Sequence, residues 1–295
     1  MLALLVRSSC SIIANGLEAL PRDRKEPDVG ITAPDLRRFK AEGRRFAMLT
    51  CYDYLTARAL DEAGIPVVLV GDTLGIFVLG HETTIPVTME DIIHHCRAVR
   101  RGLHQALLVA DLPFGAYQAS RAEGLTNAIR LVKEGGAAVV KLEGPEFELV
   151  AALSTMGIPV IGHLGLTPQS FHGFGGNKVQ ARTMAAAEQL VADAVALEEA
   201  GACAVVLEAV PSEAAARVTD TLKIPTIGIG AGPHCDAQVL VSTEMLGLGP
   251  GPSPRFVKHY ADLRGVVVDA ARRFAEEVAA RTYPDHEHSY DWELH

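Results

Sequence analysis

Residues 67–75, VVLVGDTLG, contain the pattern that decides the fold. Four aliphatic residues form an apolar run that is too short for a buried helix and long enough for a buried strand. Gly71 ends the run, and the carboxylate of Asp72 follows at once. The stretch therefore predicts a buried strand that presents a polar group where the chain leaves the sheet.

The same kind of ending recurs along the chain. Apolar runs lead to Asp111, to Lys141 with Glu143, to His163 and to Glu208. Buried strands with polar groups at one end are typical of a parallel α/β sheet whose site lies at the carboxyl ends of its strands. Amphipathic segments that close at glycine or proline separate these runs and predict helices between the strands.

This alternation predicts a (β/α)₈ TIM barrel, with a doubly wound open sheet as the alternative. The connection between the last two expected strands is unusually short. A long amphipathic helix is expected over roughly residues 255–281. The expected strands cover 46–53, 67–70, 107–110, 139–142, 160–162, 204–208, 226–229 and 239–242.

Composition limits the class of protein. The chain has 295 residues, 48% of them hydrophobic and 21% charged, as in a globular protein. A net charge of −9 with no basic stripe argues against nucleic-acid binding. Five scattered cysteines without a CxxC pair indicate neither a disulfide framework nor a zinc site, which favours a reducing, cytoplasmic location.

The first residues differ from the rest. Residues 1–30 contain no run long enough to cross a membrane, and their charge is misplaced for a signal peptide. We expect a poorly structured N-terminal extension, with an organellar presequence as the alternative. Residues 31–295 are then a single barrel domain with a C-terminal helix.

Strand parity places two charged side chains on one face. Lys141 and Glu143 are two residues apart, so both leave the same side of a strand, while Val140 and Leu142 face the helices. A lysine and a glutamate aimed into a barrel mouth are costly unless they pair or bind a ligand. A purely structural ion pair is the alternative interpretation.

Three acids are expected to meet at the mouth. Asp72, Asp111 and Glu143 follow the second, third and fourth strands, which are neighbours in a barrel. An all-oxygen pocket suits Mg²⁺. Each acid alone could equally cap a loop.

The far side of the mouth carries His163 and Glu208. His163 could point into the mouth or bond a loop carbonyl. Glu208 ends the sixth strand in an apolar setting, across from the three acids, which suits a general base. The turn GIGAG (228–232) could hold a phosphate or could simply be a tight connection.

The chain from about residue 32 to 289 resembles the ketopantoate hydroxymethyltransferase family. The resemblance implies a TIM barrel similar to the phosphoenolpyruvate mutase and isocitrate lyase enzymes, assembled as a homodecamer. It rests on VGDTLG (70–75), PVTMED (86–91), VADLPF (109–114), VKLEG (140–144), GHLGLTPQS (162–170), FGGNKVQAR (174–182), LEAVP (207–211) and IPTIGIGAG (224–232).

The resemblance also implies a reaction on small molecules. A hydroxymethyl group moves from the co-substrate 5,10-methylenetetrahydrofolate to 3-methyl-2-oxobutanoate through a Mg²⁺-stabilised enolate, giving 2-dehydropantoate, the first committed step of pantothenate biosynthesis. The implied roles are Mg²⁺ ligation by Asp72, Asp111 and Glu143, oxo-acid binding by Asp72, Thr73, Asp111 and Lys141, and proton removal by Glu208. We place His163 with the oxo-acid contacts.

The chain departs from the family pattern at a few positions. Thr73 replaces a serine, Asn177 an aromatic residue and Ala181 a glycine, while Thr243 and Glu244 stand where histidine and aspartate are usual. The loops on the folate side are therefore expected to differ.

Overall fold

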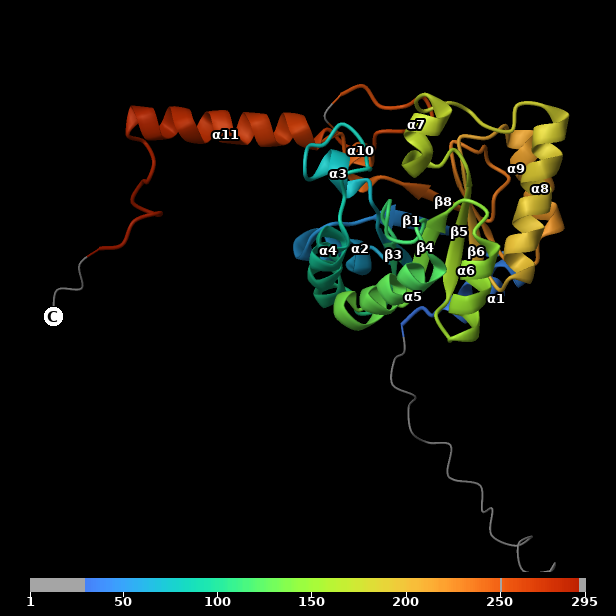
Figure 1. Cartoon of the computed structure of the whole chain (residues 1–295). Coiled ribbons are helices and arrows are strands. Elements are labelled where there is room, and N and C mark those ends of the chain that lie inside the picture. Colours follow the sequence, from blue (N-terminus) through green and yellow to red (C-terminus); the bar gives the residue numbers. More distant parts are fainter. Residues whose placement is uncertain (1–29, 250, 292–295) are drawn as a thin grey trace, which may run out of the picture.

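The computed structural model describes residues 30–249 and 251–291. Eight parallel strands form a closed barrel in sequence order (Figure 1), which confirms the TIM barrel and excludes the open sheet. The strands are β1 (Phe46–Thr50), β2 (Val67–Val70), β3 (Leu107–Asp111), β4 (Val139–Glu143), β5 (Val160–Gly165), β6 (Ala204–Glu208), β7 (Thr226–Ile229) and β8 (Ala237–Leu240).

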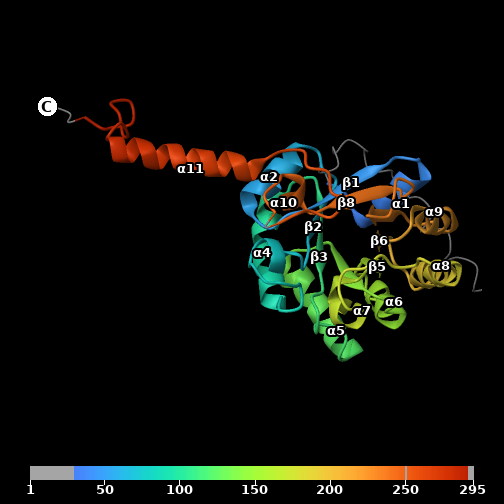
Figure 2. The same ribbon diagram turned by 90° about the horizontal axis from the view of Figure 1, so that it is seen from above.

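Helices cover the outside of the barrel. Figure 2 shows them around the ring of strands, and their apolar faces meet the outward residues of the strands, Val140 and Leu142 among them. A capping box at Thr88 and Asp91 starts the helix before β3. The outer helices are α2 (Tyr54–Glu62), α4 (Met89–Gly102), α5 (Arg121–Arg130) continued by the π-helical turn η1 (Leu131–Gly135), α6 (Phe147–Thr155), α8 (Met184–Glu199) and α9 (Ser212–Thr221).

A second core fills the barrel itself. Met48, Val109, Ile161 and Val206 point inward and pack with their counterparts from the other strands. Helix α1 (Ala33–Ala41) closes the end where the strands begin, and its Leu36 joins this inner core, fully buried.

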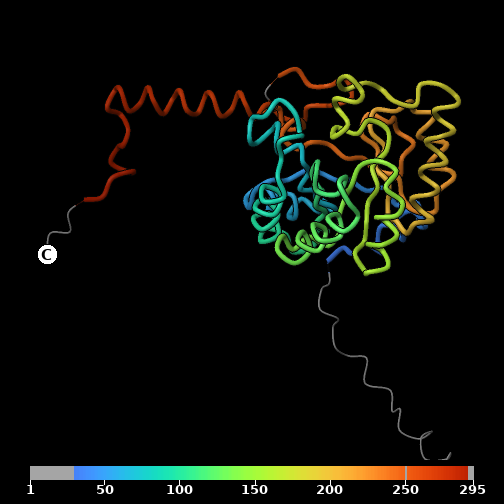
Figure 3. The backbone as a smooth tube through the Cα atoms, in the orientation of Figure 1, coloured from blue at the N-terminus to red at the C-terminus, as the bar shows by residue number. Residues whose placement is uncertain are grey.

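Short elements lie over the opposite end, the mouth. They are α3 (Leu74–Phe77), η2 (Pro168–Ser170), α7 (Phe171–Phe174) and α10 (Ser242–Met245). The backbone tube in Figure 3 runs through long loops at this end, as expected where binding residues gather. No helix in residues 30–249 and 251–291 is long and apolar enough to cross a membrane.

Several element boundaries differ from the prediction. Strands β3 and β4 end one residue later than expected, and β5 runs to Gly165 instead of ending at 162. Strand β1 stops at Thr50, and Asp53 instead caps α2 by accepting the N–H of Thr56. Strand β8 covers Ala237–Leu240 rather than the predicted 239–242, because the N–H of Ser242 donates to Thr50 Oγ1 where α10 begins. The final helix starts late, after Asp262.

The last helix, α11 (Leu263–Ala280), begins where Asp262 accepts the N–H of Gly265. The preceding residues 251–262 contain two prolines and a glycine, which explains why no helix forms there. Figures 1 and 2 show α11 extending away from the barrel, and no residue of it is buried. The predicted N-terminal extension lies outside the described residues, apart from Gly30.

The short link between β7 and β8 is confirmed, and it contains no helix. In the GIGAG turn, a Cβ on Gly230 would meet the ring of Phe256, and one on Gly232 would overlap Ser212. Both glycines have positive φ. Close packing and backbone conformation therefore account for these glycines, and nothing in the turn indicates a phosphate site.

Candidate active site

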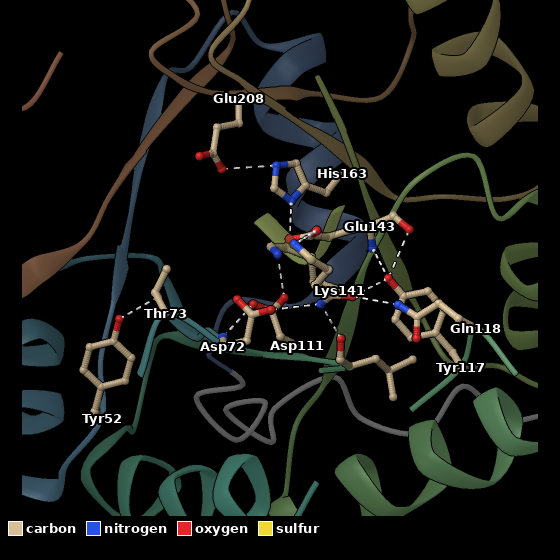
Figure 4. A network of polar contacts seen from close by, with 12 residues as sticks. Tyr52, Asp72, Thr73, Asp111, Tyr117, Gln118, Lys141, Glu143, His163 and Glu208 are labelled. Carbon is tan, nitrogen blue, oxygen red and sulfur yellow. Dashed lines mark hydrogen bonds and ion pairs between the residues drawn. The ribbon is translucent and has the colours of Figure 1, made fainter. Parts of the chain in front are cut away.

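Four strands bring their terminal side chains together at the mouth (Figure 4). The register pairs Asp111 with Lys141 and Glu143 with His163, so each polar group lies beside one from the next strand. Gly165 pairs with Glu208 and completes the arc. The side chains of all the residues predicted for the site line one cavity at this end: Asp72, Thr73, Asp111, Lys141, Glu143, His163 and Glu208.

Lys141 is the buried cation of the site. Its Nζ lies 2.6 Å from Asp111 Oδ1, and both side chains are almost completely buried. Burial alone would lower the pKa of Lys141, but the charges of Asp111, Glu143 and Asp72 raise it, so the ammonium stays charged. Lys141 is therefore paired with Asp111 on the neighbouring strand.

Asp72 lies in a surplus of negative charge. Its pKa is raised well above the usual range, first by burial and then by Asp111 and Glu143. Burial also raises the pKa of Asp111, although Lys141 opposes this. Buried like charges of this kind favour protonation or the binding of a cation.

His163 joins two carboxylates across the mouth. Its Nδ1 lies 3.3 Å from Glu143 Oε1 and its Nε2 lies 3.3 Å from Glu208 Oε2. Burial and Lys141 lower the pKa of His163, but contacts with the two glutamates outweigh them and raise it to about 9. Of the two predicted orientations, the one into the mouth is confirmed.

Glu143 is held in its ionised form. Burial would raise its pKa, but His163, Lys141 and the backbone N–H of Gln169 lower it below the usual value. The Gln169 N–H donates to Glu143 Oε2 at 2.9 Å. One carboxylate oxygen thus faces the imidazole and the other is fixed by the loop after β5.

Glu208 is more open than its apolar neighbours suggested. Its side chain is 19% exposed, so it is reached from the mouth rather than enclosed. Its backbone is firmly placed: its carbonyl accepts the N–H of Leu166 at 2.8 Å, and a Cβ on Gly165 would overlap that carbonyl. His163 connects Glu208 to the acid side of the site, which the sequence did not predict.

Gln169 is the site residue that the sequence reasoning missed. Its Nε2 donates to Asp72 Oδ2 and to the carbonyl of Leu112, both at 2.9 Å. Its Oε1 accepts from Tyr117 at 2.8 Å and from Gln118 at 2.9 Å. A polar residue in GHLGLTPQS, after the fifth strand, was the available signal.

Thr73 lies at the edge of the cavity. Its hydroxyl is 2.9 Å from the hydroxyl of Tyr52, which comes from the loop after β1. This contact orients the threonine beside Asp72. Thr73 therefore remains a candidate for contact with a substrate oxygen.

The arrangement of the acids bears on whether they could hold a metal ion. Within residues 30–249 and 251–291, no group of three or more Asp, Glu, His or Cys side chains is arranged to hold a metal ion. Lys141 and the N–H of Asp72 contact the two oxygens of Asp111, and His163 and the N–H of Gln169 contact the two oxygens of Glu143. Gln169 also donates to one oxygen of Asp72. Mg²⁺ usually needs only one or two protein carboxylates and completes its shell with water and substrate oxygens. Each carboxylate oxygen has two lone pairs, so oxygens that already accept one bond could still contact such a partly hydrated ion, and Asp72 and Asp111 are joined by the Asp72 N–H at 3.0 Å.

Several solved structures have a similar fold. A 2,3-dimethylmalate lyase of the PEP mutase/isocitrate lyase superfamily has a TM-score of 0.55 at 18% identity, covering 90% of this chain and 92% of its own. A phosphonopyruvate hydrolase bound to oxalate and Mg²⁺ also has a TM-score of 0.55, at 15% identity, covering 88% and 93%. These likenesses show the fold alone.

Sequence comparisons are more specific. The ketopantoate hydroxymethyltransferase family profile matches residues 30–286. The 3-methyl-2-oxobutanoate hydroxymethyltransferase of Frankia alni is 56% identical over 261 residues, covering 88% of this chain and 86% of the relative. That of Thermoanaerobacter sp. (strain X514) is 52% identical over 260 residues, covering 88% and 95%. The chain belongs to the ketopantoate hydroxymethyltransferase family of enzymes.

Proposed function

We propose that this enzyme transfers a hydroxymethyl group from 5,10-methylenetetrahydrofolate to 3-methyl-2-oxobutanoate, giving 2-dehydropantoate for pantothenate synthesis. The observation that carries the proposal is the arrangement at the mouth. An acid-rich, cation-accepting side around Asp72, Asp111 and Lys141 faces an accessible carboxylate, Glu208. The names of the relatives supply the substrate class.

Asp72 and Asp111 would hold Mg²⁺, with Glu143 interacting directly or through water. When bound, Mg²⁺ would withdraw electrons from the carboxylate and 2-oxo oxygens of the oxo acid and so make its C3–H more acidic. The threonine hydroxyl of Thr73 adds a donor at the same edge of the cavity.

Glu208 would remove the C3 proton. A general base must be accessible to the substrate, and the exposed fraction of Glu208 meets this requirement. The Nε2 atom of His163 contacts Glu208 and would position its carboxylate. Lys141 would stabilise the negative charge that develops on the 2-oxo oxygen as the enolate forms.

The bonds that change follow from the products. The C3–H bond breaks and its proton goes to Glu208. The carbon of the one-carbon unit then bonds to C3 and to the hydroxyl of one water, and both of its C–N bonds to the donor break. The proton taken from C3 and the second proton of the water end on the two nitrogens, so the donor leaves as tetrahydrofolate.

The direct test is product formation by the purified full chain. We expect 2-dehydropantoate from 3-methyl-2-oxobutanoate and methylenetetrahydrofolate, loss of turnover with EDTA, and recovery with added Mg²⁺. Turnover of dicarboxylic oxo acids in place of 3-methyl-2-oxobutanoate would instead indicate a lyase or mutase. The cytoplasmic location and the homodecamer stay predictions, and sedimentation of the purified protein would test the assembly.

A further inference from the structure

Gln169 holds two acids of the mouth at once. Its backbone N–H donates to Glu143 Oε2 and its side-chain Nε2 donates to Asp72 Oδ2, both at 2.9 Å. Only 5% of its surface is exposed, the same fraction as for Glu143. Gln169 has no part in the proposed proton transfer, so its contacts with both acids need a separate explanation.

This arrangement leaves one oxygen of Asp72 available. Both oxygens of Asp111 and both oxygens of Glu143 have contacts within the protein. Asp72 Oδ2 accepts from Gln169, but within residues 30–249 and 251–291 no hydrogen bond or ion pair reaches Asp72 Oδ1. Because Asp72 lines the cavity at the mouth, Oδ1 is the oxygen of these acids that can most readily meet a cation.

The short turn η2 fixes the backbone from which Gln169 reaches Asp72. The N–H of Ser170 donates to the carbonyl of Thr167 at 2.8 Å, and Thr167 Oγ1 donates to Ser170 Oγ at 2.9 Å. Pro168 restricts φ at the first position of the turn. The side chain of Gln169 therefore starts from a backbone that is tied on both sides.

The direction of the Gln169 amide is fixed by groups that can act in one way only. The carbonyl of Leu112, which can only accept, lies 2.9 Å from Nε2. On the other side, the hydroxyl of Tyr117 accepts the N–H of Glu143 at 3.0 Å, so its proton is left for an acceptor. Gln169 Oε1 is the nearest acceptor at 2.8 Å, and the carbonyl of Glu143 follows at 3.1 Å.

A second amide supports the same direction. Gln118 uses its own oxygen to accept the N–H of Gly115 at 2.7 Å, so its NH₂ group faces Gln169 Oε1 at 2.9 Å. Reversing the Gln169 amide would set its NH₂ against that of Gln118 and its oxygen against the carbonyl of Leu112. The network therefore always presents an N–H to Asp72.

An aspartate carboxylate turns easily about its Cβ–Cγ bond, because this torsion has only broad preferences. The hydrogen bond from Gln169 selects one orientation for Asp72. We propose that Gln169 is a positioning residue for the reaction: its amide, directed by Tyr117, turns the Asp72 carboxylate so that Oδ1 meets Mg²⁺. The inference rests on the proposed function, in which Asp72 holds this ion.

Gln169→Met tests the positioning role. Methionine has a similar length but supplies no N–H, so Asp72 loses the bond that orients it. Mn²⁺ takes oxygen ligands as Mg²⁺ does, and the EPR signal of the free ion reports its binding to the full chain without substrates. We expect the Kd for Mn²⁺ to rise about 10- to 100-fold, as is typical when a group that orients a metal ligand is removed.

Gln189→Met is the matched control. Gln189 lies on the outer helix α8, where its Nε2 donates to Asp193 Oδ1 at 2.8 Å on an exposed surface. The substitution removes the same kind of amide-to-carboxylate bond far from any predicted site residue. The Kd for Mn²⁺ should stay within about twofold of the parent, as expected for a surface change.

Tyr117→Phe is the second variant, and it leaves Gln169 itself intact. It removes one of the two donors to Gln169 Oε1, while Gln118 still donates, so the amide is held less firmly. We expect a smaller rise in the Kd for Mn²⁺, about 2- to 10-fold. This variant decides the question if Gln169→Met does not fold.

The outcomes separate a positioning role from a structural one. A Gln169→Met protein that unfolds more easily but binds Mn²⁺ like the parent would make Gln169 a tie between loop and barrel, and would overturn the inference. An unchanged Kd in Tyr117→Phe, or a parent chain that binds no Mn²⁺, would overturn it as well. A parent that binds Mn²⁺ but forms no 2-dehydropantoate would defeat the proposed reaction, while the Mn²⁺ comparison would still decide the role of Gln169.

Discussion

The two ends of the barrel are formed by the same eight strands but differ in how well their buried charges are balanced. At the end where the strands begin, α1 buries Leu36 and Phe39, and one ion pair joins Lys40 to Asp236 at 2.9 Å. Lys40 also donates to the carbonyl of Thr219, and Asp236 accepts from Thr226, so this pair is well satisfied.

The mouth contains more charge than it balances. Among the described residues that line this cavity, four carboxylates, those of Asp72, Asp111, Glu143 and Glu208, meet one permanent cation, Lys141, and one imidazole, His163. Such an arrangement costs folding free energy that an apolar core would not. The closed end therefore contributes to stability, whereas the mouth keeps unbalanced charges that suit binding and catalysis.

Lys141→Met should have the largest effect. It removes the cation from buried acids, and we expect a loss of about 3–5 kcal/mol in the free energy of unfolding. Loss of charge stabilisation in the transition state should also lower kcat by about 10²–10³-fold. Denaturant unfolding and steady-state kinetics measure the two effects. Near-parental stability would show that the mouth does not depend on Lys141 for charge balance.

Lys40→Met is the matched substitution at the closed end. Lys40 and Asp236 are partly exposed, and Asp236 keeps its bonds from Thr226, so the expected loss is only about 1–2 kcal/mol. The same unfolding and kinetic measurements apply, and kcat should stay within about twofold of the parent. A large fall in kcat with intact folding would contradict the division between the two ends.

Asp72→Asn should act in the opposite direction on stability. It removes one of the crowded negative charges while an amide oxygen can still accept from Gln169. In EDTA at pH 7 we expect the free energy of unfolding to rise by about 0.5–2 kcal/mol, and activity with Mg²⁺ to be lost. A destabilised variant would show that the charge of Asp72 is balanced in the parent protein.

Ala181→Gly should give the smallest effect. Ala181 has a φ of 53°, a left-handed conformation that glycine adopts without cost. Replacing it with the residue usual in the family should raise the free energy of unfolding by up to about 1 kcal/mol. Thermal unfolding of the two proteins measures this, and a lower midpoint in the variant would show that the methyl group makes a contact worth more than the strain.

Much of the barrel was predictable because its signals are local. A few adjacent residues specify each buried strand, such as residues 67–70, and each helix cap, such as Thr88. The inward direction of Lys141 and Glu143 followed from strand parity. The predicted ends of β1 and β8 were wrong because both strands end near a hydrogen bond between Thr50 and Ser242, which are far apart in the sequence.

The residues of the site were predictable from the sequence, but the contacts between them were less so. The predicted acids, Lys141, His163 and Glu208 do share one cavity. Which partner each one takes depends on register and loop position, which one sequence does not state. Gln169 illustrates this, because its role arises from a loop that folds back from β5 over Asp72. The direction of α11 was likewise not predictable from its amphipathic pattern.

Glu208 is proposed to remove the C3 proton of the oxo acid at the charged mouth. Exchange of the C3 hydrogen of 3-methyl-2-oxobutanoate in D₂O, followed by NMR with Mg²⁺ and without folate, measures that step alone. We predict exchange by the parent enzyme and a rate about 10²–10⁴-fold lower for Glu208→Gln, with oxo-acid binding retained. Near-normal exchange by Glu208→Gln would contradict the claim and move the base elsewhere in the mouth.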